Sequence, residues 1–462
     1  MEEAGSAPNY SGDMKDKDLL DSFEKWFDDK CKKTNLVHFY YGRADIATKK
    51  IQKGDGVIVA VIDNMEDIEK KTSFLHRGKN VQVIWKFWKE DSEEASLGME
   101  EEQKLQDQQI EKLEKIEKFL EENANDLFEK HSNLEMIVAS TYRIKKGRIE
   151  ITPCIVLYCS CKGIVPINES KFPTEIDEFK TDVREGFFHL HWNLNEDVCA
   201  VSKDLLNPLR MGASIGTKDK QTEGTLGGFV RSNDEIGFIT CAHVLYDSYE
   251  METENLPSTP ITVVQPSQLR EGSQECGQSI RSVSSFSNVN AEKITVDATL
   301  VKLTERLPQQ LFFADLLTAR LIKYGFSRTT FPRYIGGTPL DLRKVKDRTA
   351  HLSKKYLKCG TTSGLTMGSL RLFSFRGRLR DSQTRKGTRR LRNEFYENQL
   401  VMRGENFSAP GDSGSFVFQV REDYIGRLDC VGMIVGAYKD KVVVTPIIPV
   451  LNALGASLIP FP

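Results

Sequence analysis

Three residues of the chain have the types and surroundings of a nucleophile, a base and an orienting acid, a set called the relay below. Ser413 stands in APGDSGSFVF between two glycines, His243 follows the strand-like run in GFITCAHVL, and Asp297 lies in VDATLVKL. A serine hydroxyl is a weak nucleophile at neutral pH and needs a positioned base, most often histidine. A carboxylate beside the imidazole then holds its other ring nitrogen in the required tautomer. The three residues together predict attack by Ser413 on an acyl carbon, with His243 as the base and Asp297 as its orienting acid.

The Gly-Asp-Ser-Gly turn offers a fourth part of such a site. Gly411 permits a backbone conformation that other residues resist, so the amides of Gly411 and Ser413 can both point at one developing oxyanion. Two alternatives stay open: Ser413 is an ordinary turn serine, or the three residues form a triad that is held out of alignment. Cys241, two residues before His243, is expected to be a small buried core residue rather than a nucleophile.

Three motifs carry a resemblance to a known family. The chain order His243, Asp297, Ser413 is that of the chymotrypsin class, whereas subtilisins and α/β-hydrolases use other orders. TCAHVL resembles the Thr-Ala-Ala-His segment of trypsin-like serine proteases, DATLVKL resembles their Asp-x-Ala-Leu strand, and GDSGS matches their nucleophile turn. Three other segments are similar to parts of the intracellular trypsin-like proteases best represented in bacteria: MGASIGT, KCGTTSGLTMGSL and TPIIPVLNAL. The resemblance spans about residues 135–462 and implies a double β-barrel with serine endopeptidase activity.

The same resemblance implies where a substrate side chain would be held. The floor of the primary pocket, six residues before the nucleophile, would be Phe407. One wall would come from the segment that contains Gly432 and Gly436, where glycines leave space. Because Phe407 carries no negative charge, an apolar or small residue is implied at the cleavage site, rather than Lys or Arg.

Asp412 raises the question of how the nucleophile turn is held in shape. In secreted members of the family, a freed N-terminus, usually Ile-Val-Gly-Gly, inserts beside the Asp that precedes the nucleophile. Asp412 is present here, but no site of a basic residue followed by Ile-Val-Gly-Gly precedes the predicted protease domain. The turn also continues as Gly-Ser-Phe instead of Gly-Gly-Pro. An activation switch of the secreted kind is therefore not expected.

The elements that must position these residues fall into a multidomain pattern. Short strand-like runs recur between Gly, Pro, Ser and Asn turns from Met211 onward, which is typical of an all-β sandwich or barrel. Apolar runs that start at Leu36, Gly56 and Asn80 predict the strands of a small α/β module. We predict four parts: the α/β module of unknown role (1–92), an acidic linker and amphipathic helix (93–134), a β-rich leader (135–195) and the trypsin-like double β-barrel (196–462).

The segment 105–130 has the pattern of an amphipathic helix. Its apolar residues recur at steps of three, four and seven: Ile110, Leu113, Ile116, Leu120 and Leu127. Such a face can pack on the following sheet, or it can form a short coiled coil through which the chain would oligomerise. Fewer than three full heptads are present, which favours packing on the sheet.

Composition excludes some classes of protein. Of 462 residues, 39% are hydrophobic and 28% charged, and the net charge of −2 exerts no general pull toward nucleic acid or membranes. No apolar run approaches the ~20 residues of a membrane helix. The nine cysteines form no disulfide framework and the N-terminus has no secretory pattern, so we expect a cytoplasmic or nuclear protein rather than a secreted one. His189 and His191 in HLHW could form a metal pair, but suitably spaced ligands are missing, so we predict no metal and no cofactor.

The basic run from Arg371 to Arg392 leaves a further alternative open. It can be a patch for nucleic acid or an acidic partner, or a solvated loop between two barrel strands, and we favour the loop. A protease that cleaves after basic residues could also cut this run, including in the protein itself. The sequence thus predicts an intracellular serine endopeptidase acting on proteins or peptides and regulated by its N-terminal module. The alternatives are a catalytically silent scaffold and a nucleic-acid-associated protein.

Overall fold

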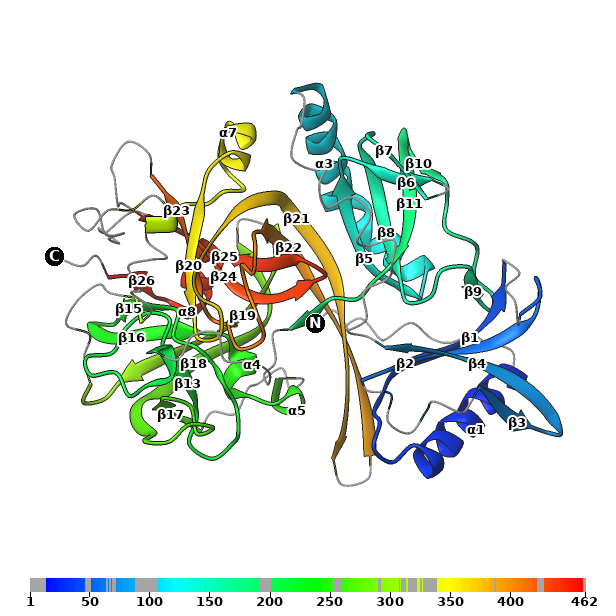
Figure 1. Cartoon of the computed structure of the whole chain (residues 1–462), viewed down its shortest axis with the longest axis horizontal. Helices are drawn as coiled ribbons and strands as arrows, with labels where there is room; N and C mark the ends of the chain where they lie inside the picture. The colour runs from blue at the N-terminus through cyan, green and yellow to red at the C-terminus, as the bar shows by residue number, and fades with distance from the viewer. Residues whose placement is uncertain are drawn as a thin grey trace. The chain divides into compact units, whose positions relative to one another are not determined.

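The protein divides into two compact units, each built from two stretches of the chain. Unit 1 comprises Met1–Phe188 and Arg376–Glu394, and unit 2 comprises His189–Phe375 and Phe395–Pro462 (Figure 1). The computed structural model describes residues 14–459 except for 46–50, 64, 66–67, 69–71, 88–106, 146, 191–200, 252–258, 290–291, 307, 309–312, 315–321, 325, 327–338, 386–387 and 422–427. Within the described residues, no helix combines the length and the apolar character that spanning a membrane requires.

One part of unit 1 is a five-stranded sheet covered by a helix. Its strands, in the order β3-β4-β2-β1-β9, are Ser73–His76, Lys79–Phe87, Gly56–Ile62, Leu36–Ala44 and Ile164–Pro166, and only β2 and β4 are parallel. The strands predicted from Leu36, Gly56 and Asn80 are therefore present. Successive residues of β2 point to opposite faces: Ile58 and Ala60 pack with Phe23 of helix α1 (Met14–Lys30), while Val57 packs on the other side. Both faces of β2 are buried, which explains its uninterrupted apolar sequence.

The other part of unit 1 is a second sheet covered by helix α3 (Asp107–Lys130). Its strands, in the order β10-β11-β8-β5, are Glu175–Ile176, Phe179–Glu185, Cys154–Cys159 and Leu134–Ser140, and β6 (Arg143–Lys145) pairs with β7 (Arg148–Glu150). Helix α3 packs on β5. All five apolar residues predicted for the buried face are at most 9% exposed: Ile110, Leu113, Ile116, Leu120 and Leu127. The prediction that this helix packs on the following sheet is confirmed.

The basic run belongs to two long paired strands, β21 (Gly364–Arg385) and β22 (Thr388–Arg403), drawn in yellow and orange in Figure 1. Arg376, Arg378 and Arg380 alternate along β21 and are buried. Arg376 donates to Glu121 O at 2.8 Å, and Arg378 donates to Phe128 O at 3.2 Å. Arg380 donates to Ser132 O at 2.6 Å, just past the end of α3.

The expectation of a solvated loop is therefore wrong for these residues. Glu121 lies inside α3, whereas Phe128 and Ser132 lie at its C-terminal end. The last carbonyls of a helix have no intrahelical partner and lie at the negative end of its dipole, so the guanidinium groups of Arg378 and Arg380 are well suited to this end. These three arginines are consequently not part of a surface for nucleic acid. The side chains of residues 381–394 lie outside the described part of the chain.

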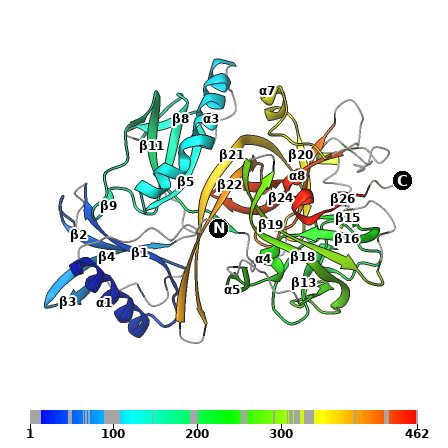
Figure 2. The same cartoon turned by 180° about the vertical axis from the view of Figure 1, so that it is seen from behind.

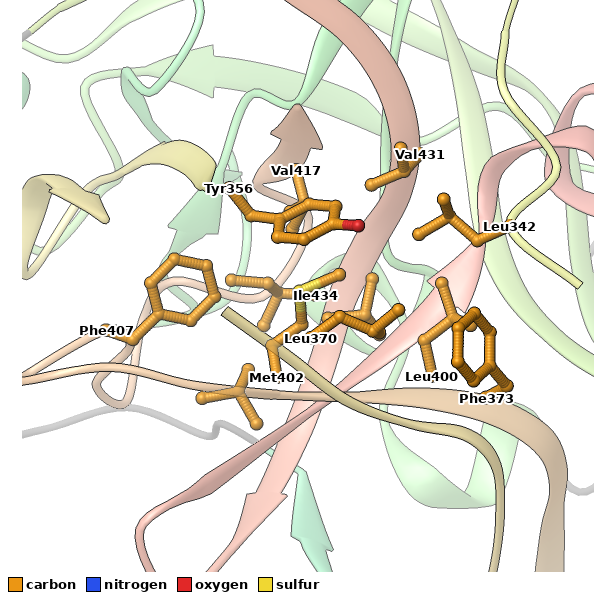
Figure 3. Close-up of a cluster of buried hydrophobic side chains, with 12 residues drawn as sticks. Leu342, Tyr356, Leu370, Phe373, Leu400, Met402, Phe407, Val417, Val431 and Ile434 are labelled. Carbon is orange, nitrogen blue, oxygen red and sulfur yellow. The ribbon is translucent and has the colours of Figure 1, made fainter. Parts of the chain in front are cut away.

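Unit 2 contains a closed antiparallel barrel. The strands β20 (Tyr356–Gly360), β23 (Phe416–Val420), β24 (Leu428–Tyr438) and β25 (Lys441–Pro446) complete it with the parts of β21 and β22 that belong to this unit. Pairing runs β20-β21-β22-β25-β24-β23 and returns to β20, so the ring closes. Apolar side chains from these strands, among them Tyr356, Leu370, Met402 and Ile434, fill its core (Figure 3).

An eight-stranded sheet forms the rest of unit 2. In the order β14-β13-β17-β18-β19-β16-β15-β26, its strands are Gly224–Thr225, Ser214–Thr217, Thr262–Gln265, Gln274–Val289, Glu292–Leu303, Glu235–Thr240, Gly228–Ser232 and Ser457–Leu458. Across the described residues this sheet ends at β14 and β26, so pairing closes only one of the two predicted barrels. Helix α8 (Ile447–Leu454) packs on β18 and β19 (Figure 2). The short elements of unit 2 are β12 (His189–Leu190), η2 (Val201–Lys203), α4 (Ala242–Leu245), α5 (Ser248–Met251) and α7 (Arg348–Leu352).

Candidate active site

The structure brings His243, Asp297 and Ser413 together in unit 2. His243 lies in the short helix α4, which follows β16 directly, and Ser413 lies in the turn before β23. Asp297 lies inside β19, the strand that pairs with β16. The register of that pair sets Thr240, the last residue of β16, opposite Thr299. Pairing of two neighbouring strands therefore places the carboxylate beside the start of α4.

The three side chains form one continuous chain of hydrogen bonds. Ser413 Oγ lies 2.8 Å from His243 Nε2, and His243 Nδ1 lies 2.5 Å from Asp297 Oδ2. The backbone N–H of His243 also donates to Asp297 Oδ1 at 3.1 Å. An ionised carboxylate can only accept, so the proton of the neutral ring is on Nδ1 and Nε2 is free to accept from the hydroxyl. The three predicted residues are therefore hydrogen-bonded in series, with exposures of 4% for His243, 1% for Asp297 and 0% for Ser413.

Asp297 is held in its ionised form. Burial raises its pKa, but the electrostatic interaction with His243 and hydrogen bonds outweigh that effect, so the pKa lies below the ordinary value. One of these bonds comes from Tyr396 of β22, whose hydroxyl donates to Asp297 Oδ2 at 2.9 Å. Tyr396 was not among the predicted site residues, because a tyrosine at an alternating position in a strand carries no sequence signal of its own.

Cys241 is not suited to act as a nucleophile. Its side chain is fully buried, and its thiol donates to Ile434 O at 3.2 Å. Burial, and next the charge of Asp297, raise the pKa of this thiol well above its usual value. The prediction of a buried core cysteine is confirmed. Cys241, His243 and Asp297 also lie close enough together to ligate a metal ion, but their donor atoms are already engaged in the hydrogen bonds described above.

The nucleophile turn depends on two glycines. Gly411 has φ +99° and Gly414 has φ +93°, in the region that residues with a Cβ avoid. A Cβ on Gly411 would collide with Thr362 Oγ1, and one on Gly414 would collide with Thr240 Oγ1. The special backbone conformation predicted for Gly411 is therefore present.

Asp412 has a buried ammonium partner, the side chain of Lys358. Lys358 Nζ lies 2.6 Å from Asp412 Oδ2 and also donates to Ser363 Oγ. Both side chains of this ion pair are 0% exposed. The backbone amides of Thr362 and Ala409 each donate to the carboxylate at 2.9 Å. Burial raises the pKa of Asp412, but the charge of Lys358 and these bonds hold it below the ordinary value.

Comparisons with known proteins add little to this geometry. No family model matches the chain, and no curated protein matches it. It is similar to solved structures of serine proteases. One is a glutamic-acid-specific serine protease (14% identity, TM-score 0.31, 54% of this chain and 100% of that one). Another is Thermobifida fusca protease A (14% identity, TM-score 0.30, 55% of this chain and 98% of that one). A third is Cellulomonas bogoriensis chymotrypsin (15% identity, TM-score 0.29, 55% of this chain and 98% of that one). At such scores the likeness carries no argument about activity.

The residues predicted for a substrate pocket have other surroundings. Phe407 is 1% exposed and packs in the core of the closed barrel beside Tyr356 and Met402 (Figure 3). A Cβ on Gly432 would collide with the side chain of Val444, so the space that this glycine leaves is filled by β25. Gly436 lies farther along β24 and pairs with Leu190 of β12. The specificity that these positions imply stays a prediction.

The arrangement can move a proton from a hydroxyl to an imidazole beside a fixed carboxylate. That is the machinery for making Ser413 a nucleophile in a region from which bulk water is excluded. Lys358 lies in the motif KCGTTSG, but its ion pair with Asp412 was not predicted from the sequence. The available signal was a lysine inside a strand-like segment, because a charge in a buried strand needs a partner.

Proposed function

We propose that this protein is a serine endopeptidase of the chymotrypsin class that hydrolyses peptide bonds in proteins or peptides. One observation carries the proposal: the continuous hydrogen-bond chain from Ser413 Oγ through the His243 ring to Asp297, at 2.8 and 2.5 Å. An ordinary turn serine needs neither a ring nitrogen at bonding distance nor a buried carboxylate behind that ring. The full burial of all three groups adds to the same interpretation because it strengthens their electrostatic coupling.

The proposed reaction follows from the roles of these atoms. Ser413 Oγ attacks the carbonyl carbon of the scissile peptide bond while its proton passes to His243 Nε2. Collapse of the tetrahedral intermediate breaks the C–N bond, and the same proton passes from Nε2 to the leaving amine. Water then repeats the sequence on the acyl-enzyme, which releases the acid and restores the hydroxyl. The amides of Gly411 and Ser413 are proposed to donate to the oxyanion, and Asp297 stabilises the imidazolium formed in each half-reaction.

A fluorophosphonate probe tests the proposal on the full-length protein. We expect covalent labelling of the wild type, and none of Ser413→Ala or His243→Ala. Ser232→Ala is a matched control, because the exposed Ser232 hydroxyl donates to Gly455 O at 3.0 Å and not to any of the three residues. Labelling that persists in Ser413→Ala, or none in a folded wild type, would contradict the proposal and leave the silent scaffold as the better alternative.

We further propose that unit 1 regulates the site or recruits its targets. The proposal is supported by chain connectivity, because β21 and β22 contribute residues to both units. Breaking the buried contact between Arg380 and Glu135 in unit 1 tests it. We expect Arg380→Met to change peptide hydrolysis by the full chain. Unchanged turnover in a folded Arg380→Met variant would argue against regulation through this route.

A further inference from the structure

Strand β24 pairs with β25 along one edge and with three successive partners along the other: β23, the nucleophile turn and β12. Strand β25 pairs along the opposite edge, from Gly432 to Tyr438. The remaining edge pairs with β23 as far as Met433. The nucleophile turn follows at Ile434, whose carbonyl accepts from Gly414 N at 2.9 Å. Beyond the turn, the edge pairs with the two-residue strand β12.

Strand β12 runs along β24 toward the turn that contains Ser413. It is antiparallel to β24, with His189 opposite Ala437 and Leu190 opposite Gly436. Advancing along β12 therefore leads toward Val435, whose carbonyl oxygen lies 3.3 Å from Ser413 Oγ. Leu190 is only 2% exposed, so the strand is packed in place rather than lying loosely on the edge.

The proposed endopeptidase function requires an extended substrate beside Ser413. The scissile carbonyl has to lie about 3 Å from the serine oxygen in a fixed orientation. An extended chain achieves that by adding a strand to an open sheet edge, where main-chain hydrogen bonds align it. In this protein the edge next to Ser413 already carries a strand of the same chain, so a substrate and β12 cannot occupy it together.

We propose that β12 is an intramolecular pseudosubstrate that occupies the substrate-binding edge of β24 in the resting protein. This inference rests on the proposed endopeptidase function and concerns the regulation of the same site. The triad is aligned in the resting state, so activity is limited by access to the edge and not by the geometry of the catalytic residues. Only two residue pairs join β12 to β24, so an incoming extended peptide can displace β12 and pair with the same edge. His189 also follows directly on Phe188, the last residue of the first stretch of unit 1, so movements of that stretch reach β12 along the chain.

The test distinguishes the access of a peptide to the edge of β24 from the reactivity of Ser413. Leu190→Pro removes the backbone N–H and the leucine side chain of residue 190. Proline is poorly tolerated in such a ladder. If about a tenth of the wild-type molecules have an open edge, we expect kcat/KM for an internally quenched extended peptide to rise about tenfold. The rate of labelling by a small fluorophosphonate, which needs the triad but not the strand edge, stays within about twofold of wild type on the same reasoning. Leu458→Pro, in the two-residue strand β26, which pairs with β15 and not with β24, is the matched control and leaves both rates unchanged.

A second measurement does not depend on the stability of that variant. The synthetic peptide Phe-Phe-His-Leu-His-Trp, which has the sequence of residues 187–192, is added to the full-length protein. We expect competitive inhibition of Leu190→Pro and weaker inhibition of the wild type, with none from a scrambled peptide. Equal kcat/KM in wild type and a folded Leu190→Pro, or no inhibition by the peptide while both proteins are labelled, overturns the inference and leaves the endopeptidase function intact. Absence of labelling in both proteins overturns the endopeptidase function itself, and this inference with it.

Discussion

Replacing Lys358 by methionine tests whether the ion pair with Asp412 holds the nucleophile turn. Methionine keeps most of the length and apolar volume of the lysine stem but removes the ammonium. The carboxylate of Asp412 is then left buried with hydrogen bonds but without a counter-charge. Removal of one partner from a buried ion pair costs about 3–5 kcal/mol. For a domain of about 150–250 residues each kcal/mol lowers Tm by roughly 2–4 °C, so a fall of roughly 6–20 °C is expected.

The matched control is Lys302→Met. Lys302 pairs with Glu235 in the eight-stranded sheet, but these side chains are 46% and 45% exposed. Exposed pairs contribute about 0–1 kcal/mol, so little change is expected. Urea denaturation of both variants at pH 7 provides the comparison. A loss for Lys358→Met within about 1 kcal/mol of the control would refute the reasoning.

The pH dependence gives the same prediction a second readout. In the wild type the pKa of Asp412 lies below its ordinary value, so its contribution to stability is complete above a pH of about 4 and is lost as the pH falls through the lowered pKa. Without Lys358 the effect of burial prevails and the pKa of Asp412 rises. The difference in stability between wild type and Lys358→Met is therefore largest near neutral pH and shrinks as the carboxyl becomes protonated. Fluorophosphonate labelling of the folded variant is also expected to slow by about 10²-fold, because Asp412 adjoins Ser413 and a small displacement of the nucleophile is costly.

Three further predictions concern the relay. Asp297→Asn should lower kcat by about 10⁴-fold, because the amide favours the wrong tautomer of His243; a loss below tenfold in steady-state peptide hydrolysis would contradict that role. Tyr396→Phe removes one hydrogen bond to the charged Asp297, worth about 1.5–3 kcal/mol, and should lower kcat about tenfold or more, with KM as the internal check that binding is unchanged. Iodoacetamide should leave the activity of the native protein intact, because Cys241 is buried and protonated; inactivation that is lost in Cys241→Ala would indicate that the thiol takes part.

The three hydrogen-bonded residues could be picked out from the sequence because each lies in a short motif whose local chemistry is informative. His243 follows a strand-like run, Ser413 lies between two glycines, and Asp297 is a single acid in an apolar strand. Such features are local, and their chain order added a further constraint. The pairing of β16 with β19 explains why His243 and Asp297 meet. That pairing was not evident from the sequence, because β17 and β18 lie between the two strands in the chain.

The unpredicted contacts link residues that are far apart in the sequence. Lys358 and Asp412 belong to separate motifs, and nothing local to either one indicates that they pair. The same holds for β12, whose two residues form a strand only because the edge of β24 lies open beyond the nucleophile turn. The basic run was misjudged for a related reason: alternating arginines in a strand look solvated unless the helix end that accepts them is known.

The shared strands β21 and β22 have a consequence for the order in which the protein can be made. Met136 and Ile137 of β5 pair with Gly377 and Arg376, which a ribosome adds much later. Roughly 200 residues separate the first stretch of unit 1 from the end of its second stretch, and at usual rates their synthesis takes about 10–40 s. During that interval the nascent first stretch presents the edge of β5 without its final neighbour, and open strand edges invite pairing with other chains. We therefore expect the edge of β5 to stay open to pairing with other chains until Glu394 has emerged.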